Sequence, residues 1–191
     1  MILPIYAYGH QILRTRCAPI AEVDTRIAAL ISDMWETLYH TNGVGLAAPQ
    51  VGQALRLFVV DTVQIKDEEK MRTDKPPIKK VFINAQIIAE TGNVWRYEEG
   101  CLSIPQLRGD VSRNTTIRIR YLDEHGQAHE EEFDGINARV IQHEYDHIEG
   151  VLFIDKISPL KKQLLQRKLE AIRGGRVDAD YVMKFAPIGR R

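Results

Sequence analysis

The segment His143-Glu144-Tyr145-Asp146-His147 constrains the fold of this chain most, because on a helix its two histidines can bind one metal ion. Residues four positions apart lie on the same helical face, so the two imidazoles can share one ion. Glu144 stands between them, where a carboxylate can take a proton from an activated water. We therefore expect a helix that ends near Gly150, and apolar residues on more than one of its faces predict that it is buried.

Cys101 is the expected third ligand, within the segment Glu99-Gly100-Cys101-Leu102-Ser103-Ile104-Pro105. One cysteine and two histidines leave a tetrahedral ion one open position, as catalytic sites do. Proteases with a similar helix take their third ligand downstream, but no histidine follows His147. Asp155 and Glu170 remain open alternatives, although neither lies in a segment that looks built to present a ligand. Imidazole and thiolate accept Fe(II), Co, Ni or Zn, so the ligands do not identify the ion.

The length and charge of the chain limit the class of protein. A chain of 191 residues suits one domain, here residues 1–191, with a full hydrophobic core. Lys plus Arg number 26 and Asp plus Glu number 26, so the overall charge does not favour nucleic acid or an acidic membrane. The N-terminus lacks the pattern of a secretory signal and no stretch is long enough to span a membrane, which predicts a cytoplasmic protein. Cys17 and Cys101 are expected to be free thiols.

Apolar periodicity and turn residues predict a mixed organisation in which strands dominate the first two-thirds. Asp24 should cap a helix that runs to about Leu38. The charged stretch 64–80 is expected to be a solvated excursion. The expected strands are 55–60, 81–83 and 87–90, then a hairpin of 115–121 and 130–133, and finally 181–185. A third helix is expected at 160–172.

Three motifs resemble the signature motifs of peptide deformylase, in the order and spacing of that family. They are Gly43-Val44-Gly45-Leu46-Ala47-Ala48-Pro49-Gln50, Glu99-Gly100-Cys101-Leu102-Ser103 and Gln142-His143-Glu144-Tyr145-Asp146-His147. The resemblance extends to about Lys168. It implies an α+β fold in which antiparallel β-sheets surround the metal-binding helix. It also implies removal of the formyl group from N-formylmethionyl nascent peptides, with release of formate.

The resemblance also implies roles for individual residues. Cys101, His143 and His147 would hold one divalent ion, most often Fe(II) in this family, with Ni, Co or Zn as replacements. Glu144 would transfer protons, while the Gln50 side chain and the Leu102 backbone N–H would stabilise the developing oxyanion. The residues implied to contact substrate are Gly43, Val44, Gly45, Glu99, Gly100, Ile136 and Val140. Without the resemblance, Gln50 reads as an ordinary polar loop residue and the two motif glycines read equally well as turn residues.

Two regions depart from the familiar pattern of the family. Arg139 stands beside the pocket residues where many members carry an apolar side chain, which leaves the polarity of that wall open. The tail 174–191 begins with two glycines, which break the chain where some members continue a helix. Between Leu160 and Arg176 there are six basic residues and one acid. This basic helix is a candidate for contact with the ribosome, and an ordinary solvated helix face is the open alternative.

Two other function classes remain open at this point. A metalloprotease or other amide hydrolase would share the ion and Glu144, but it would cleave unformylated peptides internally. A non-catalytic protein with a structural metal would need a fourth protein ligand, for which His40, His125 or His129 would have to fold in.

Overall fold

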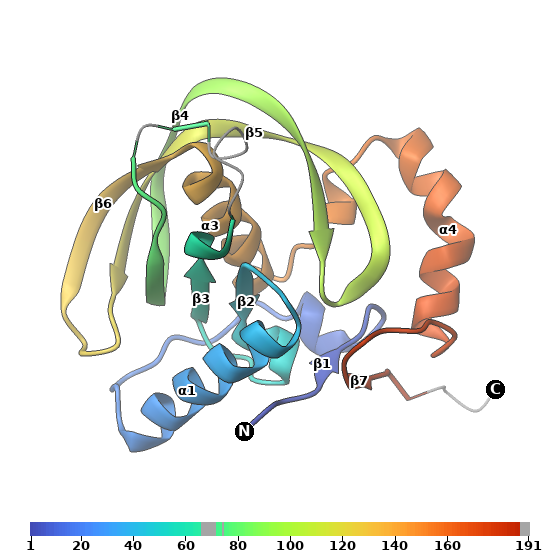
Figure 1. Cartoon of the computed structure of the whole chain (residues 1–191), viewed down its shortest axis with the longest axis horizontal. Coiled ribbons are helices and arrows are strands. Elements are labelled where there is room, and N and C mark those ends of the chain that lie inside the picture. The colour runs from blue at the N-terminus through green and yellow to red at the C-terminus, as the bar shows by residue number, and fades with distance from the viewer. Residues whose placement is uncertain (66–71, 74, 188–191) are drawn as a thin grey trace.

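A five-stranded antiparallel sheet forms the centre of the computed structural model, which describes residues 1–65, 72–73 and 75–187 (Figure 1). Its spatial order is β2-β3-β4-β5-β6. These strands span Gly45–Ala47, Leu57–Asp61, Lys79–Cys101, Ile104–Leu122 and Ala128–Asp134. The helices are α1 (Thr25–His40), α3 (Gly135–Ile148) and α4 (Pro159–Arg173), and short 3₁₀ turns span Gln11–Arg14, Ala48–Val51, Thr62–Gln64 and Phe153–Asp155. The mixed helices and antiparallel sheet confirm the expected α+β class.

Alternate side chains of β3 pack into hydrophobic clusters on opposite faces of the sheet. Phe58 and Val60 belong to the core cluster that includes Ile141 of α3 and its apolar neighbours. Leu57 and Val59 belong to the opposite cluster, with α1. Since successive side chains of a strand point to opposite faces, one strand separates the two helices. Helix α1 begins as predicted, with the Asp24 side chain accepting hydrogen bonds from two backbone N–H groups of its first turn.

The strands expected at 81–83 and 87–90 are parts of one long strand, β4, so their separation was wrong. β4 runs for 23 residues and pairs with β5 through several register shifts. Gly92 has a φ of 76° at one of these irregularities. Bulges of this kind break the two-residue alternation and bend the ribbon. Figure 1 shows β4 and β5 arching over α3, which places the far end of β4, at Cys101, beside the metal-binding helix.

The C-terminal part confirms the helix expected at 160–172 as α4, which packs Leu165, Leu169 and Ile172 into a third core cluster. The strand expected at 181–185 is shorter, because only β7 (Met183–Lys184) is extended and paired. It pairs in parallel with β1 (Ile5–Tyr6), unlike the strands of the large sheet.

No described helix is long and apolar enough to cross a membrane. Within the expected excursion 64–80, residues 66–71 and 74 lie outside the described residues, and Lys79 and Lys80 already belong to β4. The single-domain assignment of residues 1–191 stays a prediction.

Candidate active site and metal centre

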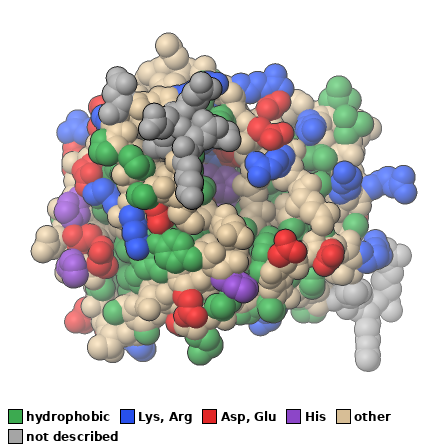
Figure 2. Space-filling model, in the orientation of Figure 1, with side chains coloured by type: hydrophobic (Ala, Val, Ile, Leu, Met, Phe, Trp, Pro, Cys, Tyr) green, Lys and Arg blue, Asp and Glu red, His purple; other side chains and the backbone are tan. Residues whose placement is uncertain are grey.

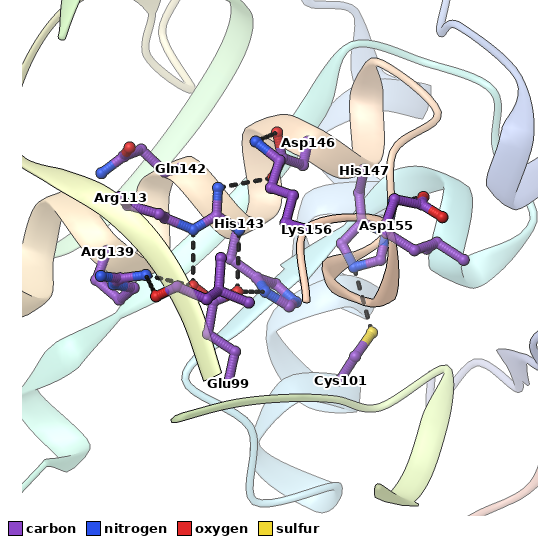
Figure 3. Close-up of polar contacts among 12 residues, drawn as sticks. Glu99, Cys101, Arg113, Arg139, Gln142, His143, Asp146, His147, Asp155 and Lys156 are labelled. Carbon is purple, nitrogen blue, oxygen red and sulfur yellow. Dashed lines mark hydrogen bonds and ion pairs between the residues drawn. The ribbon is translucent and has the colours of Figure 1, made fainter. Parts of the chain in front are cut away.

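Helix α3 and the end of β4 bring Cys101, His143 and His147 together. Their ligand atoms all lie within 4.8 Å of one another. Cys101 Sγ is 3.3 Å from His147 Nε2 (Figure 3). Around a tetrahedral ion with ordinary metal–sulfur and metal–nitrogen bonds, a sulfur and a nitrogen ligand would be about 3.5 Å apart. The donor types and their spacing therefore fit one divalent metal ion with three protein ligands.

A buried ionic network orients His143. His143 Nδ1 donates to Glu99 Oε2 over 2.9 Å, which leaves Nε2 for the ion. The Glu99 carboxylate also accepts hydrogen bonds of 2.7 and 2.9 Å from Arg113 and one of 2.8 Å from Arg139. Arg113 in turn donates to Asp146, on α3 (Figure 3). A carboxylate that accepts the second ring N–H of a ligating histidine fixes both its tautomer and its orientation.

Burial and hydrogen bonds have opposite effects on the pKa values of Glu99 and His143. Burial alone would raise the pKa of Glu99, but hydrogen bonds from Arg113 and His143 outweigh it and hold that pKa well below its ordinary value. For His143, burial works to lower the pKa, while hydrogen bonds with Cys101 and Glu99 raise it above normal. Burial lowers the pKa of His147, whose Nδ1 has no hydrogen-bond partner among the described residues.

Glu144 is buried beside the three candidate ligands with an unsatisfied carboxylate oxygen. Its residue is 3% exposed, and Oε2 has no hydrogen-bond partner among the described residues. Burial raises the pKa of Glu144 to about 7. Gly45 makes room for this carboxylate, because a Cβ at position 45 would stand 2.5 Å from Glu144 Oε1. The close approach gives Gly45 a stronger reason to be glycine than a turn would.

Gln50 points its amide nitrogen into the site. The backbone N–H of Ala47 donates to Gln50 Oε1 over 2.8 Å, which fixes the amide orientation. Gln50 Nε2 then lies 3.5 Å from Cys101 Sγ and 3.4 Å from Ser103 Oγ. Its side chain is almost fully buried. Gln50 therefore presents a donor beside the candidate metal position, and no longer reads as an ordinary loop residue.

These residues line a cleft of about 710 Å³. Every residue expected from the sequence to act in the site lines it, except His147, which lies behind the wall and is 1% exposed. Those lining residues are Gly43, Val44, Gly45, Gln50, Glu99, Gly100, Cys101, Leu102, Ile136, Val140, His143 and Glu144. Glu99 is the one whose geometry favours a different role, since its oxygens are already engaged by Arg113, Arg139 and His143.

Arg139 lines the cleft, and its positive charge is paired with the Glu99 carboxylate. Besides Glu99, it donates to the carbonyl oxygens of Val111 and Trp95 over 3.0 and 2.8 Å. Its guanidinium lies 4.7 Å from the centre of the Trp95 ring. Removing one partner of such a buried pair costs about 3–5 kcal/mol. The wall that the sequence left open is therefore polar, and its charge is paired with Glu99, although Arg139 Nε has no hydrogen-bond partner among the described residues.

The alternative ligands are engaged elsewhere. The Asp155 carboxylate pairs with Arg14 and Lys162, and Glu170 accepts a hydrogen bond from Gln166 on α4. His129 pairs with Asp123. Among the described residues, the only grouping of at least three histidine, cysteine or acidic side chains with metal-ligand spacing is Cys101, His143 and His147. No fourth ligand from the described part of the chain joins them to close a structural site. Cys17 and Cys101 are both free, as expected.

Sequence reasoning missed three residues that bear on the site: Arg113, Asp146 and Tyr181. Arg113 appears in the sequence as one polar residue in an alternating strand, and only its pairing across the ribbon brings it to Glu99. Asp146 lies inside the motif that was singled out, so its position could have suggested it. Tyr181 donates to the carbonyl oxygen of Leu102 from 79 residues away, and no local pattern announces that contact.

Known peptide deformylases are similar to this chain over nearly its whole length. The family model for polypeptide deformylase matches residues 2–163. Peptide deformylase of Cytophaga hutchinsonii is 52% identical over 97% of this chain and 98% of its own length. That of Christiangramia forsetii is 48% identical over 97% and 96%.

Solved structures of peptide deformylases have a similar fold. The crystal structure of a peptide deformylase from Legionella pneumophila superposes with a TM-score of 0.79 at 36% identity, covering 92% of this chain and 98% of that one. The enzyme from Synechococcus elongatus, solved in complex with actinonin, gives a TM-score of 0.77 at 36% identity, with 87% of each chain covered. The chain belongs to the peptide deformylase family of metal-dependent hydrolases.

Proposed function

We propose that this chain removes the formyl group from the N-terminal methionine of newly synthesised polypeptides and releases formate. The observation that carries the proposal is a buried carboxylate oxygen of Glu144, which has no hydrogen-bond partner among the described residues and lies beside three side chains with metal-ligand geometry. A structural site has no use for such a group, whereas hydrolysis needs a proton acceptor beside the ion. Family membership supports the formylated substrate over an internal peptide bond.

Cys101, His143 and His147 would hold the ion. When bound, a divalent ion supplies Lewis acidity, which lowers the pKa of water and polarises the formyl carbonyl. We propose Fe(II) as the resident ion, as the resemblance to peptide deformylase implies. Ni, Co or Zn are proposed as functional replacements, because the mixed thiolate and imidazole set accepts each of them. Metal analysis of protein purified without oxygen tests this assignment.

Glu144 is proposed to move the proton. Its carboxylate accepts a proton from the attacking water and then delivers it to the departing amine. The packing of Gly45 against Oε1 holds the carboxylate in place, and its burial keeps bulk water from competing for the proton. A positioned general base of this kind contributes about 10²–10⁴ to the rate.

The Gln50 side-chain amide and the Leu102 backbone N–H are proposed to stabilise the oxyanion. The amide nitrogen of Gln50 faces the site because Ala47 holds its oxygen. Both residues line the cleft beside Cys101. Donors that are fixed before the reaction cost no reorganisation when charge develops on the carbonyl oxygen.

The apolar wall of Val44, Ile136 and Val140 is proposed to receive the methionine side chain. Gly43 and Gly100 leave the neighbouring backbone open to the peptide, and all five residues line the cleft. Glu99 lines the same cleft, but we propose that it acts by orienting His143 and does not bind substrate.

Helix α4 is proposed to bring the enzyme to the ribosome in the cytoplasm, where nascent chains emerge. Lys161, Arg167, Lys168 and Arg173 are exposed on this helix, so their charges are available to ribosomal RNA phosphates. Figure 2 shows basic side chains gathered at the right edge of the molecule, where α4 lies in Figure 1. The helix also exposes Leu160 and Leu164.

Glu144→Ala tests the proposed function. The variant loses the proton acceptor but no ligand, so we expect it to retain the ion while formate release falls by at least about 10²-fold. Metal content and formate release from a formylmethionyl peptide are measured on the same sample, with the unformylated peptide as the control substrate. Near-normal turnover, or loss of the ion, would refute the role of Glu144. Internal cleavage of the unformylated peptide by the parent would instead favour a protease.

A further inference from the structure

We propose that Tyr181, in the C-terminal tail, is a positioning residue for the active site. It holds the turn that carries Cys101 and Leu102 in place. The inference rests on the proposed function, in which the Leu102 N–H stabilises the oxyanion. It gives a task in the reaction to residues that follow α4, beyond the segment matched by the family model.

The turn in question connects the two longest strands. Cys101 and Ile104 face each other across β4 and β5, so Leu102 and Ser103 form a two-residue turn at the end of the ribbon. A hairpin end has few neighbours of its own and moves readily unless other parts of the chain tie it down. Here the turn carries a candidate metal ligand and a candidate oxyanion donor in adjacent positions.

Two hydrogen bonds from outside the ribbon hold the backbone carbonyl groups of the turn, in addition to the contacts that Gln50 makes with the side chains of Cys101 and Ser103. The Tyr181 hydroxyl donates to the carbonyl oxygen of Leu102 over 2.8 Å. The backbone N–H of Tyr8 donates to the carbonyl oxygen of Ser103, also over 2.8 Å. Both consecutive carbonyl groups of the turn are thus held, one by the C-terminal tail and one by the N-terminal segment.

The tail is itself fixed on both sides of Tyr181. Before it, Gln106 Nε2 donates to the carbonyl oxygen of Asp178 over 2.8 Å. After it, the N–H groups of Ile5 and Ala7 donate to the carbonyl oxygens of Val182 and Lys184, each over 2.9 Å, next to the β1–β7 pair. Tyr181 therefore acts from a rigid support. It also lines the cleft, together with Asp178 and Asp180.

Loss of the hydrogen bond from Tyr181 to Leu102 should slow the chemical step more than it weakens substrate binding. When the Leu102 carbonyl is released, the turn can rotate and the Leu102 N–H leaves its place beside the reacting carbonyl. A displacement of about 1 Å at a catalytic group can cost up to about 10²-fold in rate. The methionine pocket is formed mainly by α3 and Val44, so binding of the side chain does not depend on this hydrogen bond.

Tyr181→Phe tests the proposal, because it removes one hydroxyl and leaves the ring in place. The matched control is Tyr39→Phe, which removes a hydroxyl that donates to Asp61 over 2.8 Å, where neither residue lines the cleft. We expect Tyr181→Phe to lower kcat per bound metal by about tenfold with KM within about twofold of the parent. Tyr39→Phe should keep the parental kcat. In the cobalt-substituted proteins, only Tyr181→Phe should shift the visible absorption bands, since Cys101 is in the same turn.

Equal kcat per bound metal and equal cobalt spectra in the two variants would overturn the proposal. A change in KM with kcat unchanged would also overturn it, because that result indicates substrate contact and not positioning. Thermal unfolding of both variants separates a general loss of stability from the effect on the turn. Should the metal-loaded parent release no formate from formylmethionyl peptides, the proposed function itself would fail, and this outcome is distinct from either result with the variants.

Discussion

Gly45 limits how Glu144 can sit in the site. The carboxylate lies so close to the backbone of β2 that an added methyl group would stand 2.5 Å from Oε1 and 2.8 Å from Cγ of Glu144. Those contacts are too short for the side chain to keep its place. The glycine therefore protects the alignment of the proton acceptor, which links a residue of the first motif to chemistry in the third.

Gly45→Ala should consequently resemble loss of Glu144 more than loss of the metal. We expect formate release to fall by about 10²-fold or more, since the displaced carboxylate no longer meets the water proton. The metal content should stay close to that of the parent because Cys101, His143 and His147 are untouched. Formate release and metal content are measured side by side. Parental activity in Gly45→Ala would show that the carboxylate can act from another position.

The two cysteines offer a second contrast at this scale. Cys101 lies beside two histidines at the candidate metal centre, whereas Cys17 is buried in the apolar core, and burial raises the pKa of its thiol to about 11. Cys101→Ser should weaken metal retention, because a hydroxyl is a poorer ligand than a thiolate. Cys17→Ser should retain the ion. Competition with a chelator measures both, and equal retention in the two variants would place the third ligand elsewhere.

At the scale of elements, local patterns predicted well what depends on local spacing. The helix with His143 and His147 is visible in the sequence because its ligands repeat every four residues. The length of β4 was not visible in the sequence, because the bulges that bend this strand over α3 interrupt the two-residue alternation. The roles of Arg113 and Tyr181 were also invisible, since each depends on a contact between distant parts of the chain.

Asp155 joins three short elements and gives a prediction about stability. Its carboxylate accepts from the Leu152 N–H over 3.0 Å and pairs with Arg14 and Lys162, so it connects the turn Gln11–Arg14, the turn Phe153–Asp155 and α4. Burial alone would raise the pKa of Asp155, but the hydrogen bond from Arg14 outweighs it and the net pKa is lowered. Asp155→Asn should therefore lower the free energy of unfolding at pH 7 by about 1 kcal/mol.

The sign of the pH dependence follows from the lowered pKa. Stability from the Asp155 carboxylate is present above the ordinary value of 3.8 and is lost as the pH falls through the lower value in the folded protein. The difference between parent and Asp155→Asn should thus be constant near neutrality and shrink below pH 3.8. Urea unfolding across this range measures it. A difference that grows in acid would contradict the ion-pair explanation.

At the scale of the whole molecule, a neutral chain carries one strongly basic helix. Lys plus Arg and Asp plus Glu are equal at 26 each, so the positive charge of α4 is offset by acids elsewhere. Such an uneven distribution lets one face approach RNA phosphates while the rest of the molecule is not attracted. The apolar core places α4 against β5, and Lys161, Arg167, Lys168 and Arg173 remain exposed.

Replacing Lys161, Arg167 and Lys168 together by Gln tests ribosome contact. Binding to purified ribosomes should weaken, and the slope of log affinity against log salt should fall by about two to three, because each phosphate contact contributes about 0.7–0.9. The matched control replaces Arg96, Arg118 and Arg120, which are exposed on β4 and β5, and should bind like the parent. Formate release from free peptides should be equal in all three proteins, since none of these side chains lines the cleft. If both triple variants lose affinity equally, attraction depends on net charge and α4 is not the docking surface.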